Sequence, residues 1–372
     1  MSKKAVCISC FHEYDNRIRF VIAQLEEMGY ECTYITSDFA HIQKEHFEIS
    51  LPNAMQIPTK PYYKNLSVER LSSHHFFARD AFRQVEKIDP DLLFTMVPPN
   101  SVAQYAARYK KKHPKCKLIL DIFDLWPETF PSNRVKKLLA LPFSLWGSLR
   151  NKALKAADLV TTECSLYHKT LEKYCGKEKL CTLHPAKELP QLEPAVCLPE
   201  DSISLCYLGS INNIIDIPRI GQVIAAIGGP VQLHIIGDGE RRQELIDTAE
   251  AAGAEVTFHG KIYDAAEKQK IFDLCHFGLN IMKDSVCVGL TLKSMDYLAG
   301  GLPIINNIPG DTWALVESHG IGINFENDSA LPEQALLKPQ ETRAGIREFF
   351  RERFSQEAFL KNVGEILRRL EK

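Results

Sequence analysis

The chain has 372 residues, and because a single hydrophobic core rarely grows past roughly 250–300 residues, we expect two domains. Hydrophobic residues make up 45% of the chain and charged residues 25%, as in ordinary soluble globular proteins. Forty-five Lys and Arg against 47 Asp and Glu give a formal net charge of −2, which argues against binding nucleic acid through overall charge.

The cysteines and the first residues indicate a cytoplasmic protein. There are 11 cysteines, an odd number, and the start of the chain lacks a secretory signal, so we expect reduced and mostly buried thiols. Cys7 and Cys10 form a C-x-x-C, but no second pair stands at metal-ligand spacing, and no metal site is expected. No apolar run approaches the 18 residues of a membrane span.

The first half of the chain alternates short apolar runs with segments of helical spacing. This alternation predicts a mostly parallel sheet covered by helices on both faces. The predicted strands are Ala5–Ser9, Glu31–Thr36, Asp91–Met96, Leu118–Ile122 and Leu159–Thr162, and the predicted helices are Ile18–Met28, Ser101–Lys112 and Leu166–Tyr174.

Residues 188–199, rich in Pro, Leu and Glu, interrupt this rhythm and are the predicted linker. We therefore expect a Rossmann-like domain at 1–190, a second at 200–354, and a terminal helix at 355–372 that packs back toward the first domain. Two such domains would leave a ligand cleft facing the carboxyl ends of both sets of strands. The second series has predicted strands at Ser204–Leu208, Val231–Ile236, Glu255–His259, Phe277–Ile281 and Pro303–Asn306, and helices at Asp238–Ala252, Asp264–Leu274 and Thr291–Ala299.

Three predicted strands of the second domain end in glycine motifs that suit a nucleotide. Gly209 and Ser210 follow one strand and Gly237 another, where free N–H groups and close backbone approach favour a diphosphate. His259 and Lys261 flank a third glycine, where a base or phosphate would lie. Each motif alone also fits a plain turn, with Asp238 or Gly239 as the cap of the next helix.

The helix predicted from Thr291 carries the strongest signal. Its first turn, at Thr291 and Leu292, offers unpaired N–H groups and the positive end of the helix dipole. Lys293 and Asp296 share one face, where the cation neutralises phosphate and the carboxylate accepts ribose hydroxyls. The alternative is a solvent-exposed Lys–Asp pair on an ordinary helix.

At these residues the sequence resembles the retaining glycosyltransferases of family 4, which have the GT-B fold. The order Tyr-x-Gly, Gly-Asp-Gly-Glu, Phe-x-Gly and Lys-x-x-Asp-Tyr-x-Ala-x-Gly-x-Pro is similar to theirs over residues 205–317. The resemblance implies that Asp296 binds the nucleotide ribose. The chain departs from the family pattern at Val288, where relatives have a glutamate that contacts the donor sugar, and at Ser210, where they have an arginine; the next cation is Arg219.

The predicted acceptor side centres on the string Asp121-Ile122-Phe123-Asp124-Leu125-Trp126-Pro127-Glu128. Carboxylates at the end of a strand orient hydroxyls or accept a proton, and Trp126 offers a flat face to a sugar ring or to the core. The string is similar to one in bacterial family-4 enzymes that build surface polysaccharides. Asp124 is thus the leading catalytic candidate and Glu128 the second.

A loop after the first strand adds His12, Asp15 and Arg17 to the predicted acceptor side. Asp15 also fits a helix cap. Arg17 is poorly placed for the helix dipole, which indicates either a ligand anion or an acidic partner within the protein. Residues 134–155, an apolar stretch flanked by cations, fit either a helix on an anionic membrane surface or a buried helix with basic ends.

These features together favour sugar transfer from a nucleotide-diphosphate sugar to a carbohydrate or lipid-linked glycan, and the resemblance implies that the anomeric configuration is retained. We expect no metal, since Asp121 and Asp124 are separated by two residues rather than by the one residue of an Asp-x-Asp metal motif. Two alternatives stay open. One is a non-catalytic GT-B-like subunit of a glycan-assembly complex, favoured by Val288; the other is a sugar-nucleotide epimerase on the same fold. We expect no nucleic acid partner, and a cytoplasmic location that extends to the inner membrane surface if residues 134–155 bind there.

Overall fold

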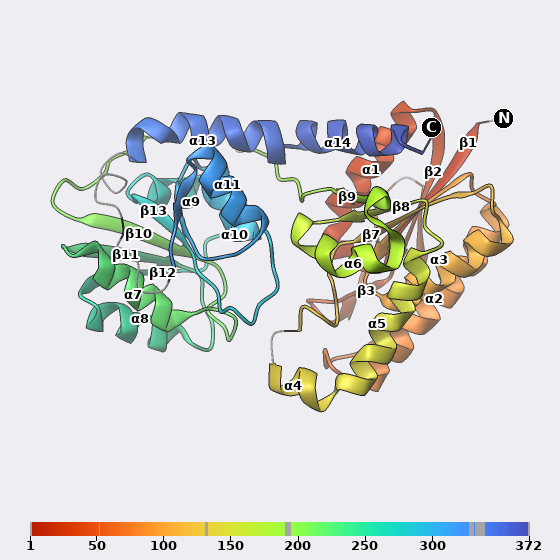
Figure 1. Cartoon of the computed structure of the whole chain (residues 1–372), viewed down its shortest axis with the longest axis horizontal. Helices are drawn as coiled ribbons and strands as arrows, with labels where there is room; N and C mark the ends of the chain where they lie inside the picture. The colour runs from red at the N-terminus through yellow and green to blue at the C-terminus, as the bar shows by residue number, and fades with distance from the viewer. Residues whose placement is uncertain are drawn as a thin grey trace. The chain divides into compact units, whose positions relative to one another are not determined.

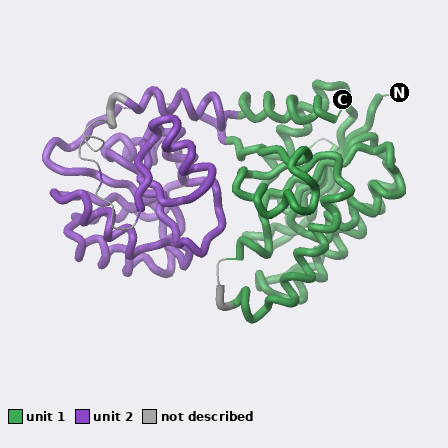
Figure 2. Tube along the Cα trace, viewed as in Figure 1, with its two compact units in different colours: residues 1–186, 356–372 green, residues 187–355 purple. Residues whose placement is uncertain are grey.

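The computed structural model describes residues 2–51, 53–130, 133–189, 195–326, 331 and 339–370, without the side chains at 133, 134 and 339–341. The chain divides into two compact units (Figure 2): unit 1 holds residues 1–186 and 356–372, and unit 2 holds residues 187–355. The first boundary thus falls just before the linker expected at 188–199, of which residues 190–194 lie outside the described residues.

Unit 1 contains a parallel sheet (Figure 1). Among the described residues it has seven strands in the order β5-β2-β1-β6-β7-β8-β9. Its central strands are buried along almost their whole length, which explains their continuous apolar runs. The strands are β1 (Lys3–Ser9), β2 (Tyr30–Ser37), β5 (Ala54–Ile57), β6 (Leu92–Val97), β7 (Lys117–Ile122), β8 (Leu159–Thr162) and β9 (Leu180–Thr182), and a separate antiparallel pair is formed by β3 (Phe39–Ala40) and β4 (Glu45–His46).

Helices connect successive strands of unit 1. One of them, α2 (Val68–Ile88), lies in a segment for which the sequence analysis predicted no element; its cap is Ser67, whose hydroxyl accepts from the Arg70 N–H at 3.1 Å. The others are α1 (Asp15–Glu27), α3 (Asn100–Lys112), α4 (Asn133–Leu138), α5 (Ala140–Leu154), α6 (His168–Cys175) and α14 (Gln356–Arg368), with 3₁₀ turns η1 (His12–Tyr14), η2 (Ser165–Tyr167) and η3 (Lys177–Lys179).

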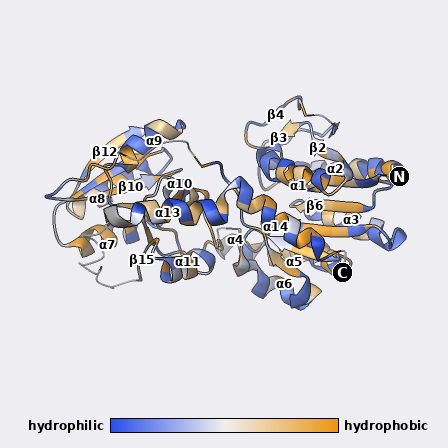
Figure 3. Ribbon diagram, turned by 90° about the horizontal axis from the view of Figure 1, so that it is seen from above, coloured by the Kyte–Doolittle hydropathy of each residue, from blue (hydrophilic) through white to orange (hydrophobic). Residues whose placement is uncertain are grey.

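Helix α14 belongs to unit 1 although it follows unit 2 in the chain. Polar and apolar residues alternate along it (Figure 3), and its apolar face, which includes Phe359, Val363 and Leu367, joins the core formed with α1 and the sheet. This amphipathic face explains why the last residues return to the first unit.

Unit 2 repeats the architecture. In its described part six parallel strands stand in the order β12-β11-β10-β13-β14-β15. The strands are β10 (Ile203–Leu208), β11 (Val231–Ile236), β12 (Ala254–Gly260), β13 (Phe277–Asn280), β14 (Ile304–Asn306) and β15 (Gly322–Asn324), and the helices are α7 (Ile217–Ile227), α8 (Arg242–Ala251), α9 (Ala265–Phe272), α10 (Leu292–Ala299), α11 (Asp311–His319) and α13 (Pro339–Phe354).

One predicted helix start in unit 2 needs correction. Helix α8 begins at Arg242 rather than at Asp238, and its N-cap residue Arg241 makes no side-chain cap. The Asp238 carboxylate instead accepts from the Gly239 N–H at 2.8 Å, which stabilises the loop before the helix. No helix in the described part of the chain combines the length and apolar character needed to cross a bilayer.

Candidate functional site

The strand orders of both units place a switch point at the middle of each sheet. In unit 1 it lies between β1 and β6, and in unit 2 between β10 and β13, where successive crossovers run in opposite directions. Ligands of doubly wound sheets bind outside the carboxyl ends of the strands at such a point. This edge is therefore where a ligand site is expected in each unit.

Unit 2 has a cavity of about 370 Å³ at this edge. Its walls come from the loops after β10, β11 and β12 and from helices α9 and α10. Most of the predicted nucleotide-binding residues are brought together here, along with residues that the sequence analysis did not assign to a ligand. The lining comprises Leu208, Gly209, Ser210, Ile236, Gly237, Asp238, Lys261, Ile262, Tyr263, Lys268, Leu292, Lys293 and Asp296.

Two glycines form the floor where the loops after β10 and β11 touch. Gly209 and Gly237 have φ angles of +117° and +136°, which residues with a side chain rarely adopt. A Cβ atom at Gly237 would lie 2.0 Å from the carbonyl oxygen of Gly209. Glycine is required at Gly237 because the two backbones are in direct contact.

Lys293 is the most unusual side chain of the cavity. It lies in the first turn of α10, is only 9% exposed, and its Nζ makes no hydrogen bond within the described residues. The ammonium lies 5.1 Å from the centre of the Tyr207 ring. Burial lowers the pKa of Lys293 to about 7, because the charged form is deprived of solvent without gaining a carboxylate partner. An anion in the cavity would supply that missing partner.

The start of α10 is fixed by Thr291. Its hydroxyl oxygen accepts from the Ser294 N–H at 3.1 Å, and its O–H donates to Asn280 Oδ1 at 2.8 Å. Thr291 is thus buried beneath the helix start and does not line the cavity, whereas Leu292 does. The predicted contribution of Thr291 is limited to orienting the helix.

Asp296 lies one turn further along α10 and is paired with cations. Its carboxylate accepts from Lys268 Nζ at 3.1 Å and also forms an ion pair with Lys187. Lys268 and Lys261 both line the cavity and bring positive charge to it, whereas the residue after Gly209 is the uncharged Ser210. Arg219, the next cation after Ser210, is bound to Asp284 at 2.8 Å.

His259 is placed away from the cavity lining. Its Nε2 lies 3.0 Å from Nδ1 of His234 on the neighbouring strand β11, and the two rings are stacked. Because one ring nitrogen is already used inside the protein, the structure gives His259 a packing contact between strands rather than a place in the cavity.

In unit 1, two carboxyl groups follow adjacent strands. Asp124 comes after β7 and accepts from the Thr129 hydroxyl at 2.6 Å; Glu163 comes directly after β8 and accepts from the Tyr167 hydroxyl at 2.8 Å. Burial raises the pKa of Asp124. Burial, and secondarily the charge of Asp124, raises the pKa of Glu163 to about 8. This pair resembles the arrangement that makes carboxyls useful as acid or base near neutral pH.

Beneath this pair, Arg17 and Asp121 form a buried ion pair. Arg17 Nε and Nη2 each donate to the Asp121 carboxylate at 2.8 Å, and Asp121 also accepts from the Thr161 hydroxyl at 2.7 Å. Of the two alternatives for Arg17, a ligand anion or an acidic partner within the protein, the structure shows the second, and the partner is Asp121. The guanidinium links α1 to β7 and is not offered to an acceptor.

The other predicted acceptor residues are also engaged within unit 1. Glu128 accepts from Arg150 Nη2 at 2.7 Å. Asp15 accepts from the Tyr34 hydroxyl and does not act as the cap of α1, whose N-cap is Tyr14. His12 lies with its ring centre 4.4 Å from that of Phe47.

Trp126 packs among aromatic rings beside the carboxyl pair. Its ring centre lies 4.7 Å from that of Trp146 and 5.3 Å from that of Phe143. The side chain therefore uses part of its surface in the interior of unit 1, the second of the two roles that the sequence allowed.

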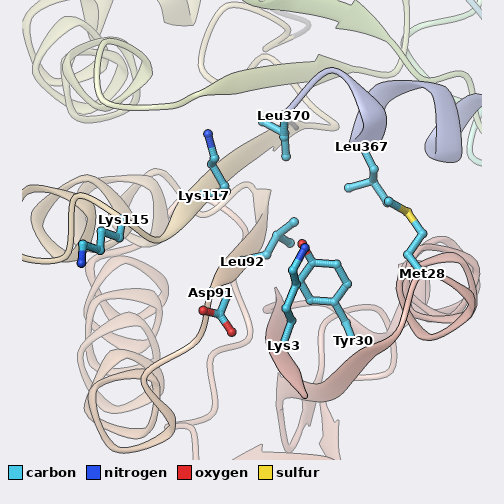
Figure 4. A pocket seen from close by; sticks show the side chains of 9 residues that line it. All are labelled: Lys3, Met28, Tyr30, Asp91, Leu92, Lys115, Lys117, Leu367 and Leu370. Carbon is cyan, nitrogen blue, oxygen red and sulfur yellow. The ribbon is translucent and has the colours of Figure 1, made fainter. Parts of the chain in front are cut away.

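A further hollow of about 420 Å³ lies at the opposite, amino-terminal edge of the unit 1 sheet (Figure 4). Leu367 and Leu370 of the C-terminal segment lie over it, and Lys3 and Lys117 come from the starts of β1 and β7. Asp91, also in the lining, accepts from the Lys4 N–H at 2.8 Å. This edge is not the one that doubly wound sheets use for ligands.

Known proteins were compared with the chain at the levels of sequence and structure. No protein-family model matches it, and no curated protein sequence does so either. Solved structures do match. Sucrose-phosphate synthase from Thermosynechococcus elongatus is similar with a TM-score of 0.72 and 15% identity, over 99% of both chains. The lipopolysaccharide outer core galactosyltransferase WaaB has a TM-score of 0.65 and 14% identity, again over 99% of both.

A third similar structure is Anabaena HepE in complex with UDP and glucose, with a TM-score of 0.62, 12% identity and coverage of 99% of this chain and 100% of that one. These likenesses extend over both units. The chain has the GT-B fold. At such low identities the fold is what the chain shares with these proteins, and the chemistry must be argued from its own residues.

Proposed function

We propose that this protein is a retaining glycosyltransferase that moves a sugar from a nucleotide-diphosphate sugar to a carbohydrate or lipid-linked glycan acceptor in cell-surface polysaccharide biosynthesis. The GT-B fold, the family-4 motif order and the two contrasting sites support it. The observation that carries the proposal is the unit 2 cavity, in which a buried lysine makes no hydrogen bond to any described residue and lies beside a glycine-lined backbone and a carboxylate.

Each part of that cavity matches one part of a nucleotide diphosphate. The diphosphate would lie over Gly209 and Gly237, with Lys293 and Lys268 as its cations and the start of α10 directed at it. The ribose hydroxyls would be bound by Asp296 after Lys268 turns toward phosphate. Binding would thereby supply Lys293 with the negative charge that it lacks in the free protein.

The same cations would also promote the reaction. As the bond between sugar and diphosphate breaks, negative charge grows on the leaving phosphate, and Lys293 and Lys268 would stabilise that charge. A phosphate oxygen would accept the proton of the attacking hydroxyl on the same face, so that configuration is retained without a protein nucleophile. Asp124 would orient the acceptor hydroxyl, with Glu163 as its partner.

We further propose that transfer needs no metal ion. Asp121, the other aspartate of the motif that follows β7, is already bonded to Arg17 and Thr161. The cationic side chains of unit 2 would take the place that a divalent cation has in other nucleotide-sugar enzymes. Activity that is unchanged by a chelator would agree with this, and loss of activity that Mg²⁺ or Mn²⁺ restores would contradict it.

The segment at 134–155 supports a place on the inner face of the plasma membrane. It forms α4 and α5, in which Leu138, Leu141 and Leu145 are 82%, 72% and 62% exposed. Lys136 and Lys137 precede this apolar face. Apolar side chains beside cations suit an anionic lipid surface.

The proposal is tested by thermal shift with a panel of nucleotide sugars, followed by transfer assays with glycan acceptors. A ligand that binds only the folded protein raises its melting temperature, so the panel identifies base and sugar together. We expect one nucleotide sugar to stabilise the protein and to be consumed when an acceptor is present. Binding without turnover on any acceptor would favour the non-catalytic subunit, and an altered sugar formed without an acceptor would favour the epimerase.

A further inference from the structure

Unit 1 contains a second large cavity, of about 590 Å³, between α2, α3 and α5. This volume is in the range of small-molecule sites. The residues that line it come from the three helices and from the segments just before them. They are Leu66, Leu71, His74, His75, Pro99, Ser101, Gln104, Leu139, Pro142, Phe143, Leu145, Trp146, Ser148, Leu149 and Lys152.

The lining is apolar, with a cation at one position. Leucine, proline and aromatic side chains predominate, and among the described lining residues none is acidic, whereas Lys152 is positively charged. The apolar wall is continuous with the exposed surface of α5, because Leu145 belongs to both. A cavity of this kind suits a ligand with a long apolar part and a negatively charged end.

The cavity shares a wall with the predicted acceptor site. Phe143 and Trp146 line the cavity, and both contact Trp126, which follows Asp124 by two residues. Leu71 also lines the cavity, and Arg70 precedes it in α2. The Arg70 guanidinium lies 6.0 Å from the centre of the Trp126 ring, and its Nη1 donates to the Asn65 carbonyl oxygen at 2.8 Å. The Nε of Arg70 is buried and makes no hydrogen bond within the described residues.

We infer that this cavity binds the aliphatic chain of a phosphate-linked lipid acceptor, with the phosphate between Lys152 and Arg70 and the sugar to be extended beside Trp126 and Asp124. The inference rests on the proposed function for the identity of the sugar end. It narrows the acceptor from a carbohydrate or lipid-linked glycan to an anionic glycolipid, and it assigns the aliphatic chain of that glycolipid a site within the protein.

The dependence of affinity on the length of the ligand's aliphatic chain tests for such a site. Burying one methylene group favours binding by about fourfold, so affinity should rise with each added carbon until the cavity is full. Inorganic phosphate lacks the chain and should not compete at millimolar concentration. If α5 only contacted a membrane surface, the affinity for a single amphiphile molecule in solution would not depend on the length of its aliphatic chain.

The test uses octyl, decyl and dodecyl phosphate below their micelle concentrations, with inorganic phosphate as the chain-free probe. The chain has three tryptophans, of which Trp146 lines the cavity and Trp126 contacts it, so binding is followed by tryptophan fluorescence in the Trp313→Phe background. Ser148→Phe and Gln104→Phe fill the cavity from opposite walls. Ser144→Phe, at an exposed position of α5 outside the lining, is the matched control.

We expect dodecyl phosphate affinity to fall about tenfold or more in both cavity-filling variants and to stay within about twofold in the control. Equal affinities in Ser148→Phe, Gln104→Phe and Ser144→Phe, or no dependence on chain length in the unsubstituted cavity, would overturn the inference. So would binding seen only with lipid vesicles. Nucleotide-sugar binding, measured in the same variants, should be unchanged; its absence in all of them would count against the proposed function and leave the lipid result standing.

Discussion

The six described strands of unit 2 follow the same spatial order as six strands of unit 1, but the two units present opposite chemistry at the corresponding edge of the sheet. At the carboxyl ends of the unit 2 strands lie glycines and lysines, and one of these lysines is buried without a hydrogen bond to the described part of the chain. At the corresponding edge of unit 1 lie Asp124 and Glu163, both with raised pKa values. The fold determines where a ligand site forms, and the side chains that follow each strand determine which ligand it suits.

The contrast is sharpest in the ionisable groups. Burial works against the charged form in both units, lowering the pKa of Lys293 and raising that of Glu163. The pKa values of both groups, about 7 for Lys293 and about 8 for Glu163, therefore lie close to neutral pH in the free protein. In unit 2 an arriving anion would restore the charge, whereas in unit 1 a neutral carboxyl can donate a hydrogen bond to a hydroxyl group.

The largest effect is expected from exchanging the two aspartates for alanine. Asp124→Ala should lower kcat by about 10²–10³-fold with little change in nucleotide affinity, because in the proposed mechanism this carboxyl group orients the acceptor hydroxyl. Asp296→Ala should chiefly weaken nucleotide binding. Steady-state kinetics measure the effect on kcat, and calorimetric titration measures the effect on nucleotide affinity. An equal loss of nucleotide affinity in both variants would contradict the assignment of nucleotide binding to unit 2 and acceptor binding to unit 1.

Lys293→Met tests the buried cation. Nucleotide affinity should fall about 10–100-fold, the usual size of a charged hydrogen bond. The free protein should become more stable, by up to about 4 kcal/mol at pH 7, because the folded state no longer holds a lysine whose pKa is lowered by burial. Chemical denaturation and nucleotide titration measure the two effects. A variant that loses stability would show that Lys293 has a structural role instead.

The pH dependence of nucleotide-sugar binding follows from the same lysine. Lys293, with a pKa of about 7, is mostly protonated at pH 6 and mostly neutral at pH 8, and a diphosphate in the cavity would bind the protonated form. Affinity should therefore fall about tenfold from pH 6 to pH 8. A nucleotide sugar is the suitable probe, since its diphosphate does not titrate there. Calorimetry that shows the same slope in Lys293→Met would assign the dependence to another group.

Glu163→Gln tests the raised pKa of Glu163, a shift opposite in direction to that of Lys293. The pKa of Glu163 in the folded protein, about 8, lies above its ordinary value of 4.5, so the folded state binds more protons between these limits and stability falls as pH rises through them. The variant should remove that fall and keep activity at pH 7. If the neutral form is needed, kcat of the native protein at saturating nucleotide sugar decreases about tenfold from pH 7 to pH 9, and the kcat profile of Glu163→Gln is flat.

The sequence identified the parts of each site that follow a strand directly. The proximity of Lys293 and Asp296 could be predicted from their spacing in one helix, whereas Gly209 and Gly237 could each be predicted only to end an apolar run. Similar reasoning placed Asp124 after its strand. What joins these residues into one site is the parallel order of strands, which the alternating pattern already indicated.

Pairings between distant segments could not be predicted in this way. Lys268 contacts Asp296 because two crossovers bring α9 beside α10, and Glu163 lies near Asp124 because β8 is the neighbour of β7. No feature of the sequence around Arg17 predicts that its partner is Asp121, which lies 104 residues further along the chain. Helix α2, by contrast, was readable from Ser67 as a cap and from the helical spacing of the apolar residues that follow.

The matched pair Lys268→Gln and Lys270→Gln offers the most direct measurement on unit 2, since both lysines lie on α9 and only Lys268 lines the cavity. Calorimetric titration with the nucleotide sugar selected by thermal shift should give about tenfold weaker binding for Lys268→Gln and native affinity for Lys270→Gln. Native affinity in both variants, or equal losses in both, would contradict the placement of the diphosphate in this cavity.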